Sequence, residues 1–212
     1  MIRTASRGAY ALLVLLLAGC AGAGRPQLPA TVSEGPPVYR PGDRFVYRNE
    51  KGERAVREVV AVRDGRVLWV TEEGFRFEKR DPFIPMVAFE GRRSRGWAES
   101  VRVEGELWPL AYRKRSRITI DYRRLDKRRG IERRYSENWR CRVNRPRSVE
   151  VPAGTFEVFK VVCKRFDPET EEVTRTHIWY WAPALGHWVK RVKKYADGRR
   201  KELELVAFAR AL

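Results

Sequence analysis

Residues suited to catalysis are few in this sequence and form no familiar arrangement. The two histidines, His177 and His187, are ten residues apart and match neither the HxH nor the HExxH spacing of metal sites. We expect both imidazoles to pack among tryptophans, so neither a metal ion nor a cofactor is predicted. No GxSxG motif marks a serine nucleophile. Paired carboxylates of a glycan hydrolase remain an alternative, because acidic residues are plentiful, but no pair stands out. No catalytic residue is predicted, and a non-enzymatic protein is the favoured interpretation.

A second group of residues is suited to binding anions. The 212 residues include 45 Lys and Arg against 27 Asp and Glu, a formal net charge of +18. Guanidinium groups bind phosphate or carboxylate through two parallel hydrogen bonds. In the segment 92–140, basic residues alternate with aromatic ones, and the candidate anion-binding residues there are Arg113, Lys114, Arg115, Arg123, Arg124, Lys127, Arg128 and Arg129. The alternative is that these arginines only solvate the outer faces of strands.

The N-terminus has the three parts of a secretory signal. Arg3 and Arg7 precede an apolar run over residues 9–17, and small residues follow it. The run is shorter than the roughly 20 residues that span a bilayer. The motif Leu17-Ala18-Gly19-Cys20 resembles the lipobox of bacterial lipoproteins. The resemblance implies that residues 1–19 form a signal helix that is cleaved, that Cys20 carries acyl chains, and that the anchor lies in the outer membrane, facing the periplasm.

Residues 20–41 are expected to join this anchor to a folded domain. Five prolines fall between residues 26 and 41, and prolines remove the backbone donors that a strand needs. The composition is typical of an extended tether that follows the lipidated cysteine.

The rest of the chain, residues 42–212, predicts a single all-β domain. A hydrophobic content of 43% excludes global disorder, and 34% charged residues exclude a polytopic membrane protein. Apolar and polar residues alternate with period two, as in the run from Arg117 to Arg123, and Gly-containing turns separate the runs. We expect an antiparallel meander of about ten strands, which forms a curved sheet, a sandwich or a partly open barrel. Possible halves are residues 42–112 and 115–212.

With Cys20 assigned to the anchor, Cys141 and Cys163 remain, and a disulfide between them is predicted. Exported proteins fold in an oxidising compartment. Both cysteines lie on the apolar face of an alternating run, and the turn at residues 152–154 is midway between them. Folding the chain back at this turn would bring the two thiols close to opposite positions. Two free buried thiols are the alternative.

Two further motifs resemble a pattern from uncharacterised β-rich exported proteins and lipoproteins of Gram-negative bacteria. One is the Val-Pro-Ala-Gly-Thr-Phe hairpin at residues 151–156, and the other is the Trp-Tyr hairpin with Pro183 and Gly186 at residues 179–189. Both motifs set turns, because proline fixes φ and glycine permits unusual backbone angles. The resemblance therefore implies a fold and a location, and it implies no catalytic residues.

The leading functional hypothesis is a non-enzymatic, lipid-anchored protein that binds or scaffolds an anionic envelope component. Phospholipid, lipopolysaccharide and acidic glycan are the candidate partners, since nucleic acid fits the charge but not the compartment. A lipid or lipoprotein carrier is an alternative, with an apolar cavity lined by Phe75, Phe77, Ile118 and Ile120. An envelope glycan hydrolase is the third possibility.

Overall fold

The protein is an antiparallel β-barrel, described here from a computed structural model that places residues 32–33 and 35–211. The predicted signal peptide, Cys20 and the first part of the tether lie outside these residues. The all-β prediction is confirmed, and the barrel is the architecture realised among the three expected. The strands are β1 (Val32–Ser33), β2 (Arg44–Asn49), β3 (Arg54–Arg63), β4 (Arg66–Thr71), β5 (Arg76–Lys79), β6 (Ala88–Glu90), β7 (Ser94–Gly105), β8 (Leu110–Ala111), β9 (Arg115–Asp126), β10 (Ile131–Val143), β11 (Arg147–Val151), β12 (Gly154–Phe166), β13 (Val173–Ala182), β14 (His187–Tyr195) and β15 (Arg200–Ala209).

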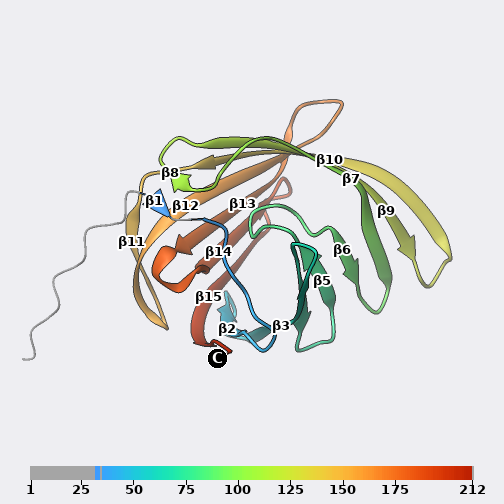
Figure 1. Cartoon of the computed structure of the whole chain (residues 1–212). Helices are drawn as coiled ribbons and strands as arrows, with labels where there is room; N and C mark the ends of the chain where they lie inside the picture. Colours follow the sequence, from blue (N-terminus) through green and yellow to red (C-terminus); the bar gives the residue numbers. More distant parts are fainter. Residues whose placement is uncertain (1–31, 34, 212) are drawn as a thin grey trace, which may run out of the picture.

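Twelve strands form the closed ring. Their order is β10-β9-β7-β6-β5-β4-β3-β2-β15-β14-β13-β12, and pairing of β12 with β10 closes it. The short strand β8 pairs with β1, and β11 pairs with the first half of β12. Figure 1 shows β7, β9 and β10 as long ribbons that extend beyond the short strands β5 and β6. Sequence neighbours are thus mostly sheet neighbours, as a meander requires.

The barrel interior is filled mainly by aromatic and β-branched side chains. Because successive residues of a strand face opposite sides, alternate residues such as Ile118, Ile120 and Tyr122 of β9 share the inner face and are nearly inaccessible to solvent. The connection between β5 and β6 adds Phe83, which packs edge-on against Trp179 and Trp181 of β13. Since β13 lies far from β5 in the ring, this loop crosses the interior and joins the two walls.

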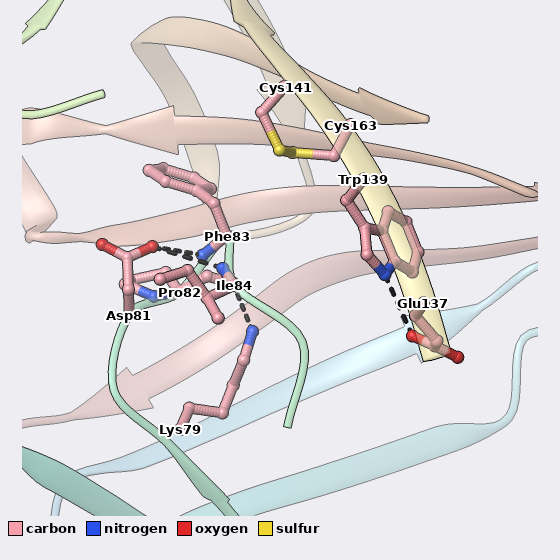
Figure 2. The surroundings of a disulfide bond; sticks show 9 residues. All are labelled: Lys79, Asp81, Pro82, Phe83, Ile84, Glu137, Trp139, Cys141 and Cys163. Atoms are coloured by element: carbon pink, nitrogen blue, oxygen red, sulfur yellow. Dashed lines mark hydrogen bonds between the residues drawn. A yellow bond between two sulfur atoms is a disulfide. The ribbon is translucent and has the colours of Figure 1, made fainter. Parts of the chain in front are cut away.

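The disulfide lies at the closing seam of the barrel. Cys141 of β10 and Cys163 of β12 are directly opposite in the antiparallel register, with Cα atoms 4.0 Å apart, and their sulfurs are bonded (Figure 2). The predicted turn at residues 152–154 connects β11 to β12, with Gly154 at a φ of 126° that favours glycine. The bridge therefore joins β10 and β12, the two strands that close the ring. In the sequence, β11 lies between these two strands.

A short segment that precedes the first long strand is part of the packed structure. We call residues 35–43 the strap. Tyr39 of the strap is buried in the core, and Asp43 accepts hydrogen bonds from the backbone of Arg40 and Ala211 and from the side chain of Arg210. In Figure 1 the strap runs from β1 to β2 along the barrel. Residues 35–41, which the sequence assigns to the tether, thus lie against the domain.

No helix within residues 32–33 and 35–211 combines the length and the apolarity needed to cross a membrane. The one helical element in that part of the chain is the single-turn 3₁₀ helix η1 (Pro183–Leu185). Its last turn ends at Gly186, whose φ of 61° is in the left-handed region. This turn sets the register between β13 and β14, which carry much of the site described next.

Candidate anion-binding site

The basic residues predicted from the sequence lie on the outside of the barrel, in two separate groups. Residues 113–115 are at the beginning of β9, whereas residues 123–129 cover its end and the turn to β10. At about 3.3 Å per residue, the eight-residue step along β9 from Arg115 to Arg123 separates the groups by roughly 26 Å. The structure does not bring them together into one surface.

Several residues of these two groups already have carboxylate partners. Arg123 pairs with Glu99 and Glu132, at 2.5 and 3.3 Å. Lys127 and Lys114 pair with Glu90 at 2.6 Å and Glu106 at 3.0 Å. Arg128 and Arg129 are exposed in the β9–β10 turn. Exposed pairs of this kind contribute little to stability, and they reduce the charge that is available to an external anion.

The two histidines also lie apart. The register of β13 and β14 places His187 opposite Ala182, beside the turn, and His177 opposite Lys193, far along the hairpin. His187 is buried between two tyrosines: Tyr39 Oη is 2.7 Å from Nδ1, and Tyr47 Oη is 2.5 Å from Nε2. Burial lowers the pKa of His187 well below its usual range, and the imidazole is neutral. A neutral ring has one donor and one acceptor nitrogen, so one tyrosine donates and the other accepts.

No group of three or more His, Cys, Asp or Glu suitable for a metal occurs within residues 35–211. The histidines therefore have structural surroundings: His187 ties the strap to β2, and His177 packs between Trp139 and Trp179. The Nε2 atom of His177 is buried and has no hydrogen-bond partner in the described part of the chain.

The residues with the most unusual surroundings are five cations inside the barrel, which the sequence analysis missed. We call them the inner cations, and they come from four strands. They are Arg57 of β3, Lys79 of β5, Arg175 of β13, and Arg191 and Lys193 of β14. Arg191 is opposite Trp179 and Lys193 is opposite His177, so the β14 cations share the inner face with these rings. All five are only partly accessible to solvent.

The inner cations have no ion-pair partner among residues 35–211. The nearest carboxylate to Lys79, that of Asp81, is engaged elsewhere. Its Oδ1 accepts a hydrogen bond from the backbone N–H of Phe83 at 2.7 Å (Figure 2), and its Oδ2 accepts one from the indole of Trp108. Lys79 itself donates to the carbonyl of Pro82. The positive charge in the barrel is thus not neutralised by a contacting side chain.

This crowding is reflected in the pKa values of the lysines. Burial, together with the charges of Arg191 and Arg57, lowers the pKa of Lys79 to about 7, although Asp81 acts in the opposite direction. Burial also lowers the pKa of Lys193 well below its usual range, with Arg191 and Arg57 as the next causes. Perturbed groups of one sign that converge in a concave region are typical of functional sites.

Three of the inner cations line a pocket together with aromatic rings. Arg57, Lys79 and Arg191 share it with Trp179 and Trp188, and Pro36, Pro37 and Tyr39 of the strap contribute to its wall. The space open to the centres of water molecules is about 50 Å³. The pocket is therefore small, basic and partly covered by the strap.

The two arginines of the pocket lie on one indole ring. The guanidinium carbons of Arg57 and Arg191 are 5.3 and 5.1 Å from the centroid of Trp188, and Tyr47 stacks on the same ring at 4.3 Å. Lys79 Nζ is 5.7 Å from the centroid of Trp179. Cation–π contacts of this type hold the cationic groups in place without consuming their hydrogen-bond donors.

The pocket continues toward one mouth of the barrel. Arg191 also lines a second, more open hollow between the β2–β3 and β14–β15 hairpins, together with Lys193, Arg200 and Lys201. Six basic side chains and the three carboxylates of Glu50, Glu53 and Glu202 line this hollow, so basic groups are in excess between the solvent and Arg191. Such an excess raises the local concentration of anions near the pocket.

The apolar residues proposed for a carrier cavity are part of the packed core. Phe77, Ile118 and Ile120 are at most 5% exposed and belong to the single core cluster, and Phe75 packs on Phe77 and Phe89. Neighbouring side chains cover them, so these residues offer no support for a lipid-filled interior.

The fold has a counterpart among solved structures. The hypothetical lipoprotein YmcC from Escherichia coli K12 superposes with a TM-score of 0.53, at 8% sequence identity, over 81% of this chain and 87% of that chain. The chain thus shares the fold of YmcC. Weaker similarities are to a candidate lipoprotein from Parabacteroides distasonis, with a TM-score of 0.40, 12% identity and coverage of 86% and 100%, and to a candidate exported protein with a YmcC-like fold from Bacteroides fragilis, with a TM-score of 0.43, 12% identity and coverage of 84% and 100%. No family model and no curated protein matches the sequence.

Proposed function

We propose that the protein is a lipid-anchored, non-enzymatic envelope protein that binds an anionic envelope component inside its barrel. The single observation that carries the proposal is the group of five inner cations without carboxylate partners in residues 35–211, three of which line a pocket. Placing charge in a poorly solvated interior is costly unless an opposite charge accompanies it. An anionic ligand supplies that opposite charge.

The location rests on the sequence and on the fold neighbours. The lipobox-like motif ending at Cys20 places the protein in the bacterial envelope, with the signal peptide removed and acyl chains attached. The description of YmcC as a hypothetical lipoprotein supports the same compartment. The resemblance to bacterial lipoproteins favours the outer membrane, because Ala21 and not Asp follows the cysteine. Lipopolysaccharide, anionic phospholipid and acidic glycan are the partners present there.

The sequence also proposed the outer basic residues as the binding site, and one experiment separates the two sites. The full chain, in detergent, is passed over immobilised lipopolysaccharide at low salt and again at 1 M salt. The Arg57→Gln/Arg191→Gln variant removes two inner cations, and Arg128→Gln/Arg129→Gln is a matched control that removes two exposed ones. We expect the wild type and the control to be retained at low salt and the inner variant to elute.

Two results would count against the proposal. No retention of the wild type on lipopolysaccharide, on acidic glycan or on anionic liposomes at low salt would refute anion binding. Loss of retention in the control, with the inner variant retained, would place binding on the outer surface instead. The anchor is tested separately by intact-mass analysis, where a chain that starts at Met1 without acyl groups would refute the location.

A further inference from the structure

The inner pocket has features that narrow the class of anion. This inference rests on the proposed function, because it concerns the same site. We propose that Arg57, Arg191 and Lys79 clamp a dianionic phosphoryl group, the terminal phosphate of a phosphomonoester, while the rest of the ligand extends through the barrel mouth.

The charge favours a dianion. The pocket is lined by three guanidinium groups, those of Arg57, Arg80 and Arg191, by the ammonium group of Lys79 and by one carboxylate, that of Asp81. Asp81 and Glu73 act on the pKa values of Lys79 and Arg57 but make no ion pair with them. A carboxylate or a phosphodiester brings one negative charge. A phosphomonoester brings about −1.5 to −2 at pH 7, which matches the charge of Arg57, Arg191 and the partly protonated Lys79 more closely.

The donors favour a group with three terminal oxygens. Arg57 and Arg191 both lie against Trp188, at 5.3 and 5.1 Å from its centroid, so their guanidinium carbons are at most about 10 Å apart. They come from different strands, β3 and β14, and Lys79 comes from a third, β5. A carboxylate has two oxygens and is satisfied by one bidentate arginine. A phosphoryl group has three oxygens for two forks and one ammonium group.

The size of the pocket favours a small head group. The space for water centres is about 50 Å³, and one water needs about 10–15 Å³ of such space, so the pocket holds roughly four waters. A phosphoryl group, with one phosphorus and three terminal oxygens, is of this size. An acyl chain or a sugar chain is not, and it must lie outside, where Lys193, Arg200 and Lys201 line the hollow that continues from Arg191.

The direct test compares small anions on one sugar scaffold. Binding of glucose 1-phosphate and of glucuronate to the full chain is measured by isothermal titration calorimetry in phosphate-free buffer. We expect the phosphomonoester to bind at least about tenfold more tightly, equivalent to one extra charge-assisted hydrogen bond. Equal or tighter binding of glucuronate would overturn the phosphoryl clamp. The proposed function would still stand if lipopolysaccharide or acidic glycan were retained through the inner cations.

A second arm identifies the source of the phosphate. Vesicles that contain phosphatidic acid present a phosphomonoester, and vesicles that contain phosphatidylglycerol present a diester with the same glycerolipid. Preference for phosphatidic acid, lost in Arg57→Gln/Arg191→Gln, supports the clamp with a lipid head group as the source. Equal binding to both vesicles, together with no binding of glucose 1-phosphate, refutes it.

Variants of Arg191 separate a loss of binding from a loss of folding, because binding and thermal unfolding are both measured for each variant. Arg191→Gln is expected to weaken glucose 1-phosphate binding by about tenfold to a hundredfold. Arg191→Lys keeps the charge but loses the fork, so an intermediate loss is expected. The exposed Arg128→Gln/Arg129→Gln control should bind within about twofold of the wild type. Variants of Arg191 that melt cooperatively like the wild type and bind the phosphomonoester equally well would refute the assignment.

Discussion

Neutralising an inner cation should stabilise the protein in the absence of ligand. The relevant pair is Arg57 and Arg191, whose guanidinium carbons lie 5.3 and 5.1 Å from one indole centroid and therefore at most about 10 Å apart. At an effective dielectric constant of about 20, two like charges at about 10 Å repel by about 1.7 kcal/mol. Replacement of Arg191 by methionine keeps most of the aliphatic stem but removes this repulsion. It also removes a cation–π contact with Trp188, worth about 0.5–1 kcal/mol.

A double-mutant cycle isolates the repulsion from these other effects. Arg57→Met and Arg191→Met each remove the same repulsive pair, so the double variant removes it only once. The stability gained by the double variant should thus fall short of the sum of the single gains by about 1–2 kcal/mol. Urea unfolding, followed by far-UV circular dichroism in phosphate-free buffer, measures the four free energies. A coupling of zero, or one that shows attraction between the two arginines, would refute the electrostatic account.

The remaining predictions concern the seam, the strap and the pH dependence. Replacing Cys141 and Cys163 by alanine opens a loop with a sequence separation of 22 residues and should lower the unfolding free energy by about 3 kcal/mol, measured by urea unfolding. An unchanged midpoint would show that the seam does not depend on the bridge. Tyr39→Phe leaves His187 Nδ1 without its partner at 2.7 Å and should cost about 1–3 kcal/mol, with faster proteolysis near residue 39 as a local readout. Because burial lowers the pKa of Lys79 to about 7, binding of glucose 1-phosphate should weaken by up to about tenfold per pH unit above pH 7, as the ammonium group loses its proton. The charged groups that act on the pKa of Lys79 are Asp81, Arg191 and Arg57. Lys79 in turn lowers the pKa values of Lys193, His177 and His187. Titrations of Lys79→Met and Lys193→Met assign the slope, and a slope that survives in Lys79→Met would contradict the assignment.

The fold could be predicted from the sequence because its signals are local. Alternation of polar and apolar residues and the regular turn signals are enough for an antiparallel meander, and the pairing of Cys141 with Cys163 follows from their shared apolar faces. Closure of the ring is a different matter. The turn at residues 152–154 and the two cysteines imply that the runs around Cys141 and Cys163 pair, but no local pattern shows that this pairing of β10 with the second half of β12 closes a ring.

The inner cations could not be predicted, because in an alternating strand apolar residues are expected to face the interior and charged residues the solvent. In β14, Val192 is apolar and Arg191 and Lys193 are charged, so the pattern predicts Val192 inside and the cations outside. In the structure Arg191 lines the pocket, and Val192 is on the other face of the strand, where it is also buried, at 2% exposure. A register shift between Tyr180 and Trp181, at the β13–β14 turn, contributes to this change of phase. The pairing of β13 with β14 is the signal that indicates the inner position of Arg191, because it places this residue opposite the buried Trp179.

The cost of this arrangement is the strongest argument that the inner cations serve binding. Apolar residues at the same positions would extend the core without repulsion, and a buried charge without a partner is among the most destabilising features of a protein. The disulfide at the closing seam contributes about 3 kcal/mol, which is enough to offset one or two repulsive pairs of the size worked out above. If Arg191→Met gains stability and loses phosphomonoester binding in the same protein, the residue is retained at the expense of stability, as residues of binding sites commonly are. If it loses both, the arginine is needed by the fold, and the argument from electrostatic cost fails.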